Sequence, residues 1–174
     1  KTFTALNPVT NGVATVADGD APDTATMVRR FRNRLYLAGM PGANEQVNFS
    51  ALGNGDSWSA ADYFGVPSQS ITVGLTSGDP ISALAIHQDR LIIFKKRSIW
   101  AWDGNVLHQI NSQHGCVGKR AFAVLDNYLY FADSDGIYRL SGNFVAKVSI
   151  NIQATCDDVP YSRIGQTAMA AFKG

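Results

Sequence analysis

The stretch ISALAIHQDRLIIFKKRSIWAW, from Ile81 to Trp102, decides the fold. It holds three short apolar runs, Ile81–Ile86, Arg90–Phe94 and Ser98–Trp102, rich in β-branched and aromatic residues and without a helical period. The polar turn Lys95-Lys96-Arg97 separates the second run from the third. Two strands joined by a tight polar turn form a hairpin, so this stretch predicts an antiparallel sheet.

The same pattern occurs on both sides of this stretch. Each copy contains a landmark, which is a polar residue followed by any residue, a leucine and an apolar strand. The landmarks are Asn33-Arg34-Leu35, Asp89-Arg90-Leu91 and Asn127-Tyr128-Leu129, separated by 56 and 38 positions. An insertion at about 52–70 explains the longer interval. The remaining period is near the roughly 40 to 50 residues of a four-stranded propeller blade.

We therefore predict an all-β fold: a β-propeller fragment of about three four-stranded antiparallel blades, near 24–75, 81–112 and 120–150. One four-stranded sheet cannot bury both apolar faces alone, whereas stacked blades can. Closed propellers have about four to eight blades, so we expect the chain to belong to a larger closed propeller. Residues 151–174 are expected to be a linker and, at Thr167–Phe172, the first strand of a next blade.

Composition and charge exclude several classes. The chain has 174 residues, 45% hydrophobic and 17% charged, which is typical of a folded globular protein. A net charge of +1 does not favour binding to nucleic acid through the whole chain. No apolar run is long enough to span a bilayer. The start, Lys1-Thr2-Phe3-Thr4, is expected to be the interior of a longer chain.

The sequence offers little for catalysis. Cys116 and Cys156 form neither a CxxC motif nor a finger pattern, which favours a reduced, intracellular setting without zinc. The histidines 87, 108 and 114 are scattered, and no nucleophile elbow, P-loop or HExxH motif is present. We expect a protein that is not an enzyme and needs no cofactor.

The loop Asp133-Ser134-Asp135-Gly136 has two interpretations. Asp-Gly between apolar strands favours a hairpin turn. The alternative is a cation bound by Asp133 and Asp135, because alternate carboxylates can converge on a hard metal ion. Phe144 stands where a calcium loop needs its bidentate Glu, so the turn is the preferred interpretation.

Two basic clusters are candidates for contacts with DNA or a partner. A period of two places Arg30, Arg32 and Arg34 on one strand face. Lys95, Lys96 and Arg97 form a second patch at a turn. Such residues could contact phosphates without reading bases. For the arginines, a solvated face or a neutralised interface explains the cluster equally well. For Lys95-Lys96-Arg97, an ordinary exposed hairpin turn is the preferred interpretation.

Aromatic residues form two further groups. Trp100 and Trp102 alternate on one strand and are expected to pack between blades. Trp58, Tyr63 and Phe64 lie in the polar insertion at 52–70, and such excursions often carry binding residues. These three are candidates for a loop that docks a partner, with simple local packing as the alternative.

Several motifs together resemble the β-propeller structural proteins of tailed bacteriophages, over roughly Arg29 to Gln166. The group includes tail nozzle, tail tubular and head-to-tail proteins that stabilise packaged DNA. The motifs are Asn33–Gly39, Val47–Ser50, Gly55–Trp58, Gly78–Ile81, Asp89–Trp100, Gly115-Cys116 and Asp135–Tyr138.

This resemblance implies a non-enzymatic virion protein of the tail or neck, assembled in the host cytoplasm. It implies a homo-oligomeric ring around the DNA exit channel, with other tail, adaptor or portal proteins as partners and non-specific contact with passing double-stranded DNA. The rival class is a ligand-binding propeller, for carbohydrate or a similar ligand, or an enzymatic one. Its site would need convergent carboxylates or aromatics at the same end of several blades, whereas the carboxylates Asp89, Asp103 and Asp133 fall at different strand ends. A generic scaffold propeller is a third alternative.

Overall fold

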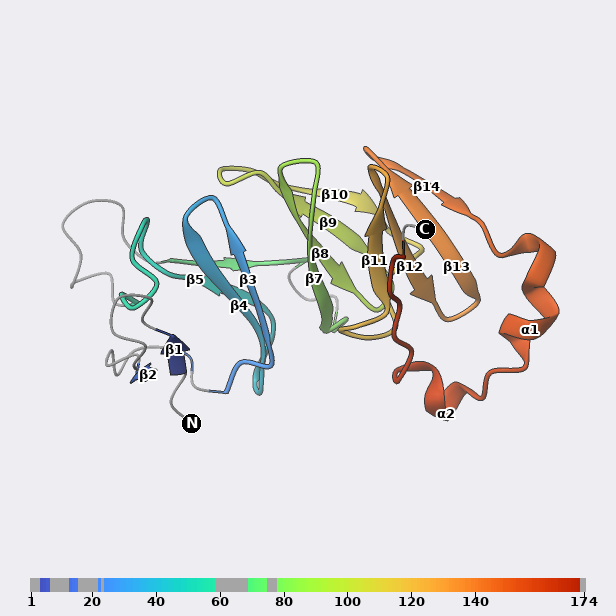
Figure 1. Cartoon of the computed structure of the whole chain (residues 1–174), viewed down its shortest axis with the longest axis horizontal. Coiled ribbons are helices and arrows are strands. Elements are labelled where there is room, and N and C mark those ends of the chain that lie inside the picture. The colour runs from blue at the N-terminus through green and yellow to red at the C-terminus, as the bar shows by residue number, and fades with distance from the viewer. Residues whose placement is uncertain are drawn as a thin grey trace. The chain divides into compact units, whose positions relative to one another are not determined.

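The predicted fold class is confirmed. The computed structural model, which describes residues 4–6, 13–15, 22, 24–58, 69–74 and 78–172, is nearly all-β. It contains three four-stranded antiparallel sheets, each with its strands in sequence order, as in blades of a propeller fragment (Figure 1). The chain divides into two compact units, Lys1–Thr72 and Val73–Gly174.

The first unit contains one of these sheets. Its strands are β3 (Met27–Phe31), β4 (Arg34–Met40), β5 (Ala43–Phe49) and β6 (Gln69–Thr72). A separate two-stranded sheet, β1 (Thr4–Leu6) with β2 (Val13–Thr15), was not predicted. The rings of Phe31, Tyr36 and Phe49 pack in series, with centroids 5.9 and 5.3 Å apart, and all three side chains are buried.

The second unit contains the other two sheets. One is formed by β7 (Ile81–His87), β8 (Arg90–Lys95), β9 (Ile99–Trp102) and β10 (Leu107–Asn111). The other is formed by β11 (Phe122–Leu125), β12 (Tyr128–Asp133), β13 (Gly136–Ser141) and β14 (Phe144–Lys147).

One tight turn recurs in all three sheets. Two residues with positive φ join the first strand to the second: Arg32-Asn33, Gln88-Asp89 and Asp126-Asn127. This backbone matches the type I′ hairpin, whose twist suits the flanking strands. Each sequence landmark therefore begins at the second residue of this turn and continues into the strand that follows.

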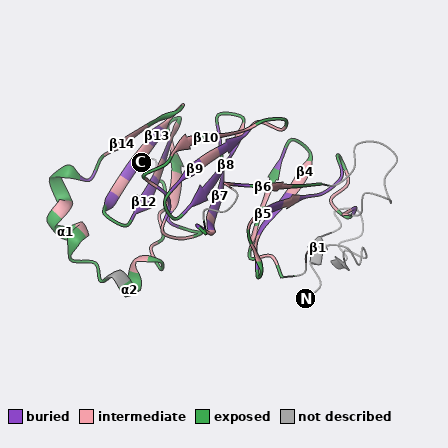
Figure 2. Cartoon of the chain, turned by 180° about the vertical axis from the view of Figure 1, so that it is seen from behind, coloured by how far each residue is buried: buried purple, intermediate pink, exposed green. Residues whose placement is uncertain are grey.

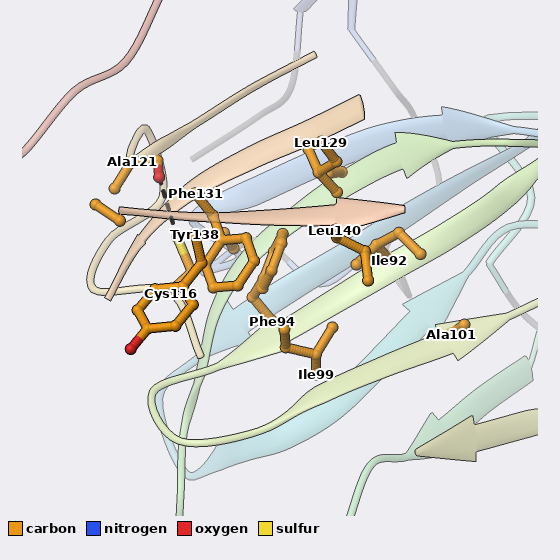
Figure 3. Packing of buried hydrophobic residues seen from close by; sticks show 13 residues of the cluster. Ile92, Phe94, Ile99, Ala101, Cys116, Ala121, Leu129, Phe131, Tyr138 and Leu140 are labelled. Atoms are coloured by element: carbon orange, nitrogen blue, oxygen red, sulfur yellow. Dashed lines mark hydrogen bonds between the residues drawn. The ribbon is translucent and has the colours of Figure 1, made fainter. Parts of the chain in front are cut away.

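A shared apolar core lies between the two sheets of the second unit. Phe94 from β8 lies 5.1 Å from Phe131 and 6.1 Å from Phe122, measured between ring centroids. Ile92 lies on the same face of β8, and Leu140 of β13 belongs to the same cluster (Figure 3). Each such side chain contributes about 1.5–3 kcal/mol by leaving water, so this core holds the second unit together.

Polar contacts join the same two sheets at one end. The guanidinium of Arg90 donates to Asn143 Oδ1 at 2.8 Å and to the carbonyl of Gly142 at 2.9 Å. Because Arg90 begins β8 and these acceptors lie between β13 and β14, the contacts fix turns of the two sheets beside each other.

The chain after β14 differs from a plain linker. It forms a 3-10 turn (Ile150–Ile152) and two short helices, α1 (Gln153–Asp157) and α2 (Tyr161–Ile164). Residues 167–172 join no sheet, and the Met169 N–H donates to the carbonyl of Arg120 at 2.9 Å. The assignment of this segment to a next blade stays a prediction. Neither described helix has the length and apolar character of a membrane span.

Candidate functional site

A cavity of about 550 Å³ opens at one end of the second unit. The β8–β9 turn, the β12–β13 turn and the end of α2 all contribute to it. Its lining includes Pro80, Lys96, Arg97, Val117, Ser134 and Ile164. It therefore combines two cationic side chains and the carboxylate of Asp79 with apolar walls.

The buried carboxylate of Asp79 builds the β8–β9 turn. It accepts the N–H of Lys96 and the N–H of Arg97, each at 3.0 Å, and the hydroxyl of Ser98 at 3.4 Å. The side chains of Lys96 and Arg97 are exposed, and in the described part of the chain neither forms an ion pair. The carboxylate of Asp79 thus fixes the backbone of the turn, and the turn exposes the cationic side chains of Lys96 and Arg97.

Lys95 does not belong to this exposed patch, and the prediction that it lies in the turn is wrong. It is the last residue of β8 and is fully buried. Its ammonium donates to the carbonyls of Val73 at 2.8 Å and Gly74 at 3.3 Å. Leu91, Ile93 and Lys95 alternate along β8, so Lys95 continues the buried face with its charge satisfied by backbone carbonyls.

Gly115 and Cys116 pack against the backbone of the β8–β9 turn. The N–H of Cys116 donates to the carbonyl of Lys95 at 3.0 Å. A Cβ on Gly115 would lie 2.2 Å from that carbonyl oxygen, so only glycine allows this approach. Burial raises the pKa of the Cys116 thiol to about 12, against a smaller lowering by its hydrogen bond to Gly118. The thiol is therefore protonated and unreactive at neutral pH.

His114 and Asp133 form a pair beside the β12–β13 turn. His114 Nδ1 lies 2.9 Å from Asp133 Oδ2, and Asp133 is only 6% exposed. The other oxygen of Asp133 accepts the N–H of Ser134 at 2.6 Å. The His114 ring also packs on Tyr138, with centroids 4.2 Å apart.

Asp135 extends this network at the surface. It accepts the Tyr138 hydroxyl at 2.9 and 3.0 Å and pairs with the Lys147 ammonium at 3.2 Å. Burial acts to raise the pKa of Asp135, but the hydrogen bonds from Tyr138 and Lys147 outweigh it and lower the pKa. Burial, followed by the bond to Asp135, raises the pKa of Tyr138.

The loop Asp133-Ser134-Asp135-Gly136 connects β12 to β13, as predicted for a hairpin turn. The structure also brings His114 to it, and one ligand atom from each of His114, Asp133 and Asp135 lies within 4.8 Å of the others. A cation here would compete with Lys147 for Asp135 and with His114 for Asp133. The arrangement is therefore chemically suited to fastening the turn, and the cation alternative stays a prediction.

The three candidate arginines, Arg30, Arg32 and Arg34, are not on one strand face, so that prediction is wrong. Arg30 is on β3, Arg32 is in the turn at φ 43°, and Arg34 begins β4. Arg30 and Arg32 are exposed. Arg34 is half-buried, donates to the carbonyl of Ser50 at 2.6 Å and lies 5.0 Å from the Phe49 ring centroid. The positive-φ turn breaks the period of two, and Arg34 has a structural role.

The aromatic candidates also separate. Trp58 is half-buried, and its indole N–H donates to the carbonyl of Gly55 at 2.9 Å, which is local packing. Tyr63 and Phe64 lie outside the described residues. Trp100 and Trp102 share one face of β9, opposite Ile93 and Leu91.

Sequence reasoning missed the residues that build this site. Asp79 precedes the turn it supports by 17 positions, and His114 precedes Asp133 by 19. The local sequence predicts only ordinary strand residues at Tyr138 and Lys147. Only the conjunction of Asp79 with Pro80 just before β7 carried a local sign of a special role.

No protein-family model matches this chain, and no curated protein is similar to it.

Proposed function

We propose that this chain is a non-enzymatic segment of a phage virion, in the tail or the head-to-tail connector. In this proposal it assembles as a ring around the DNA exit channel with other tail, adaptor or portal proteins. The observation that carries it is the recurrence of one four-stranded meander with one turn type in three sheets. Such repetition is typical of proteins whose function is geometric, because each copy adds rigid surface.

The polar groups of the site also favour a structural role over catalysis. Asp79 accepts hydrogen bonds that shape a turn, and Asp133 holds His114. The Cys116 thiol stays protonated. A cysteine nucleophile needs a nearby base or a lowered pKa, whereas the pKa of Cys116 is raised. These side chains act as supports for the backbone.

Exposed cations on turns suit contact with passing DNA. In the first unit, Arg30 lies near the end of β3 and Arg32 lies in the turn that follows. In the second unit, Lys96 and Arg97 lie at the turn between β8 and β9, where they can contact DNA or a partner. Lysine and arginine on turns can contact phosphates of any sequence, and such binding weakens as salt rises.

The test is the location of the full-length protein in particles from its source. We expect it in purified virions at a fixed multiple of the portal, with antibodies labelling the neck or tail in electron micrographs. Absence from virions, together with binding of the purified protein to a glycan array, would instead favour the ligand-binding class.

A further inference from the structure

The segment after β14 exposes apolar and acidic side chains together. We define residues 150–159 as the docking arm. Ile150 is 70% exposed, Ile152 52% and Val159 43%, and neither the 3-10 turn nor α1 buries any residue. Asp157 and Asp158 are exposed beside them, and Figure 2 shows this segment largely in the exposed colour. Clustered exposed apolar residues mark interaction surfaces.

The docking arm is held in place by its own unit. Gln153 donates to the carbonyl of Asp135 at 2.8 Å and to Asp157 Oδ1 at 2.6 Å. Just before the arm, Ser149 Oγ accepts the N–H of Ile137 at 3.0 Å. A segment ordered before binding loses less conformational entropy when it binds.

The cavity of the same unit has the complementary character. Lys96 and Arg97 supply positive charge without an ion pair among the described residues, and Pro80, Val117 and Ile164 supply apolar walls. The one acidic side chain in the described part of the lining, Asp79, directs its carboxylate at the N–H groups of the turn. No residue of the arm lines this cavity in its own copy. Opposite charges steer association, and the apolar contacts contribute affinity.

We propose that the docking arm of one copy binds the cavity of the next copy. Such a contact joins two different surfaces of the same chain, and it closes into a ring when its rotation allows. This inference rests on the proposed function, because it names the contact that builds the ring. A second copy fits better than DNA, since the apolar walls match Ile152 and Val159, whereas a rigid phosphate backbone could contact only the two cations.

Charge reversal in the full-length protein tests this contact. The cavity variant is Lys96→Glu with Arg97→Glu, and the arm variant is Asp157→Lys with Asp158→Lys. Mass photometry across a protein dilution series should show the assembly midpoint of each variant alone at least tenfold above wild type. A 1:1 mixture should assemble again near the wild-type midpoint, because every mixed junction then pairs opposite charges. That recovery also shows that both variants fold.

The control is Arg30→Glu with Arg32→Glu, two reversals at exposed positions of the other unit, which should assemble like wild type. Several outcomes overturn the inference. If both charge variants assemble like wild type, or if the mixture does not recover, the arm and cavity are not the contact, while the proposed function stands. If the cavity variant assembles normally but loses DNA binding, the occupant is nucleic acid. A wild-type monomer contradicts both proposals.

Discussion

At the residue scale, Gly115 decides how the basic turn is supported. Its missing side chain lets the chain run against the backbone of Lys95 and Lys96 and lets Cys116 donate to Lys95. Asp79 fixes the same turn from the other direction. Gly115 and Asp79 therefore determine together where the exposed cations of this turn lie.

Gly115→Ala should destabilise the second unit by about 3 kcal/mol, because backbone atoms that cannot rotate away occupy the place of the new methyl group. Urea unfolding of the chain, followed by tryptophan fluorescence, measures this loss. The control is Gly142→Ala, where φ is +61° and no atom lies within 4 Å of a Cβ, so only about 1 kcal/mol is expected. Equal losses in the two variants would contradict the crowding argument.

His87 should make stability depend on pH. It is buried, and its Nε2 is a buried atom that has no hydrogen-bond partner among the described residues. Burial, and then the charge of Arg90, lower the pKa of His87 below its ordinary 6.5. The folded state therefore binds fewer protons than the unfolded state. The stability that the folded state gains from neutral His87 is fully present above pH 6.5 and is lost as the pH falls toward the folded pKa.

Comparison with His87→Phe measures this effect. The free energy of unfolding should fall less between pH 7.5 and 5.5 in the variant than in wild type, whatever the absolute stability of the variant. Parallel pH profiles would show that His87 does not titrate differently in the folded chain.

At the scale of elements, the repeated two-residue turn determines the register of each sheet. Asn33, Asp89 and Asn127 occupy the second position of that turn, where φ is positive. Asn and Asp tolerate this conformation, so the sequence revealed the repeat. The sequence did not reveal the turn's first position, because Arg32 and Gln88 are not typical turn residues. For this reason the sequence predicts a single strand through Arg30, Arg32 and Arg34.

Gln88→Asn should stabilise the sheet by about 0.5 kcal/mol, since Asn adopts positive φ more readily than Gln. The wild-type Gln88 makes only a long, 3.4 Å hydrogen bond to Asn127, whose loss is small. The midpoint of urea unfolding should rise. A lowered midpoint would show that the positive φ of Gln88 does not cost the sheet stability.

At the scale of the whole molecule, the strands were predictable and the site was not. Alternating apolar residues such as Ile92 and Phe94 indicate a buried strand face from local sequence alone. The site depends on pairs far apart in the chain, such as His114 with Asp133 and Gln153 with Asp135. The burial of Lys95 also depends on distant carbonyls, which no local pattern reports.

The most direct test of the central claim is cryo-electron microscopy of the full-length protein, purified from its native source. The account predicts a ring of copies around a central opening, with four-stranded sheets repeating as blades. A monomer with a single closed propeller and a ligand in its central pocket would contradict it.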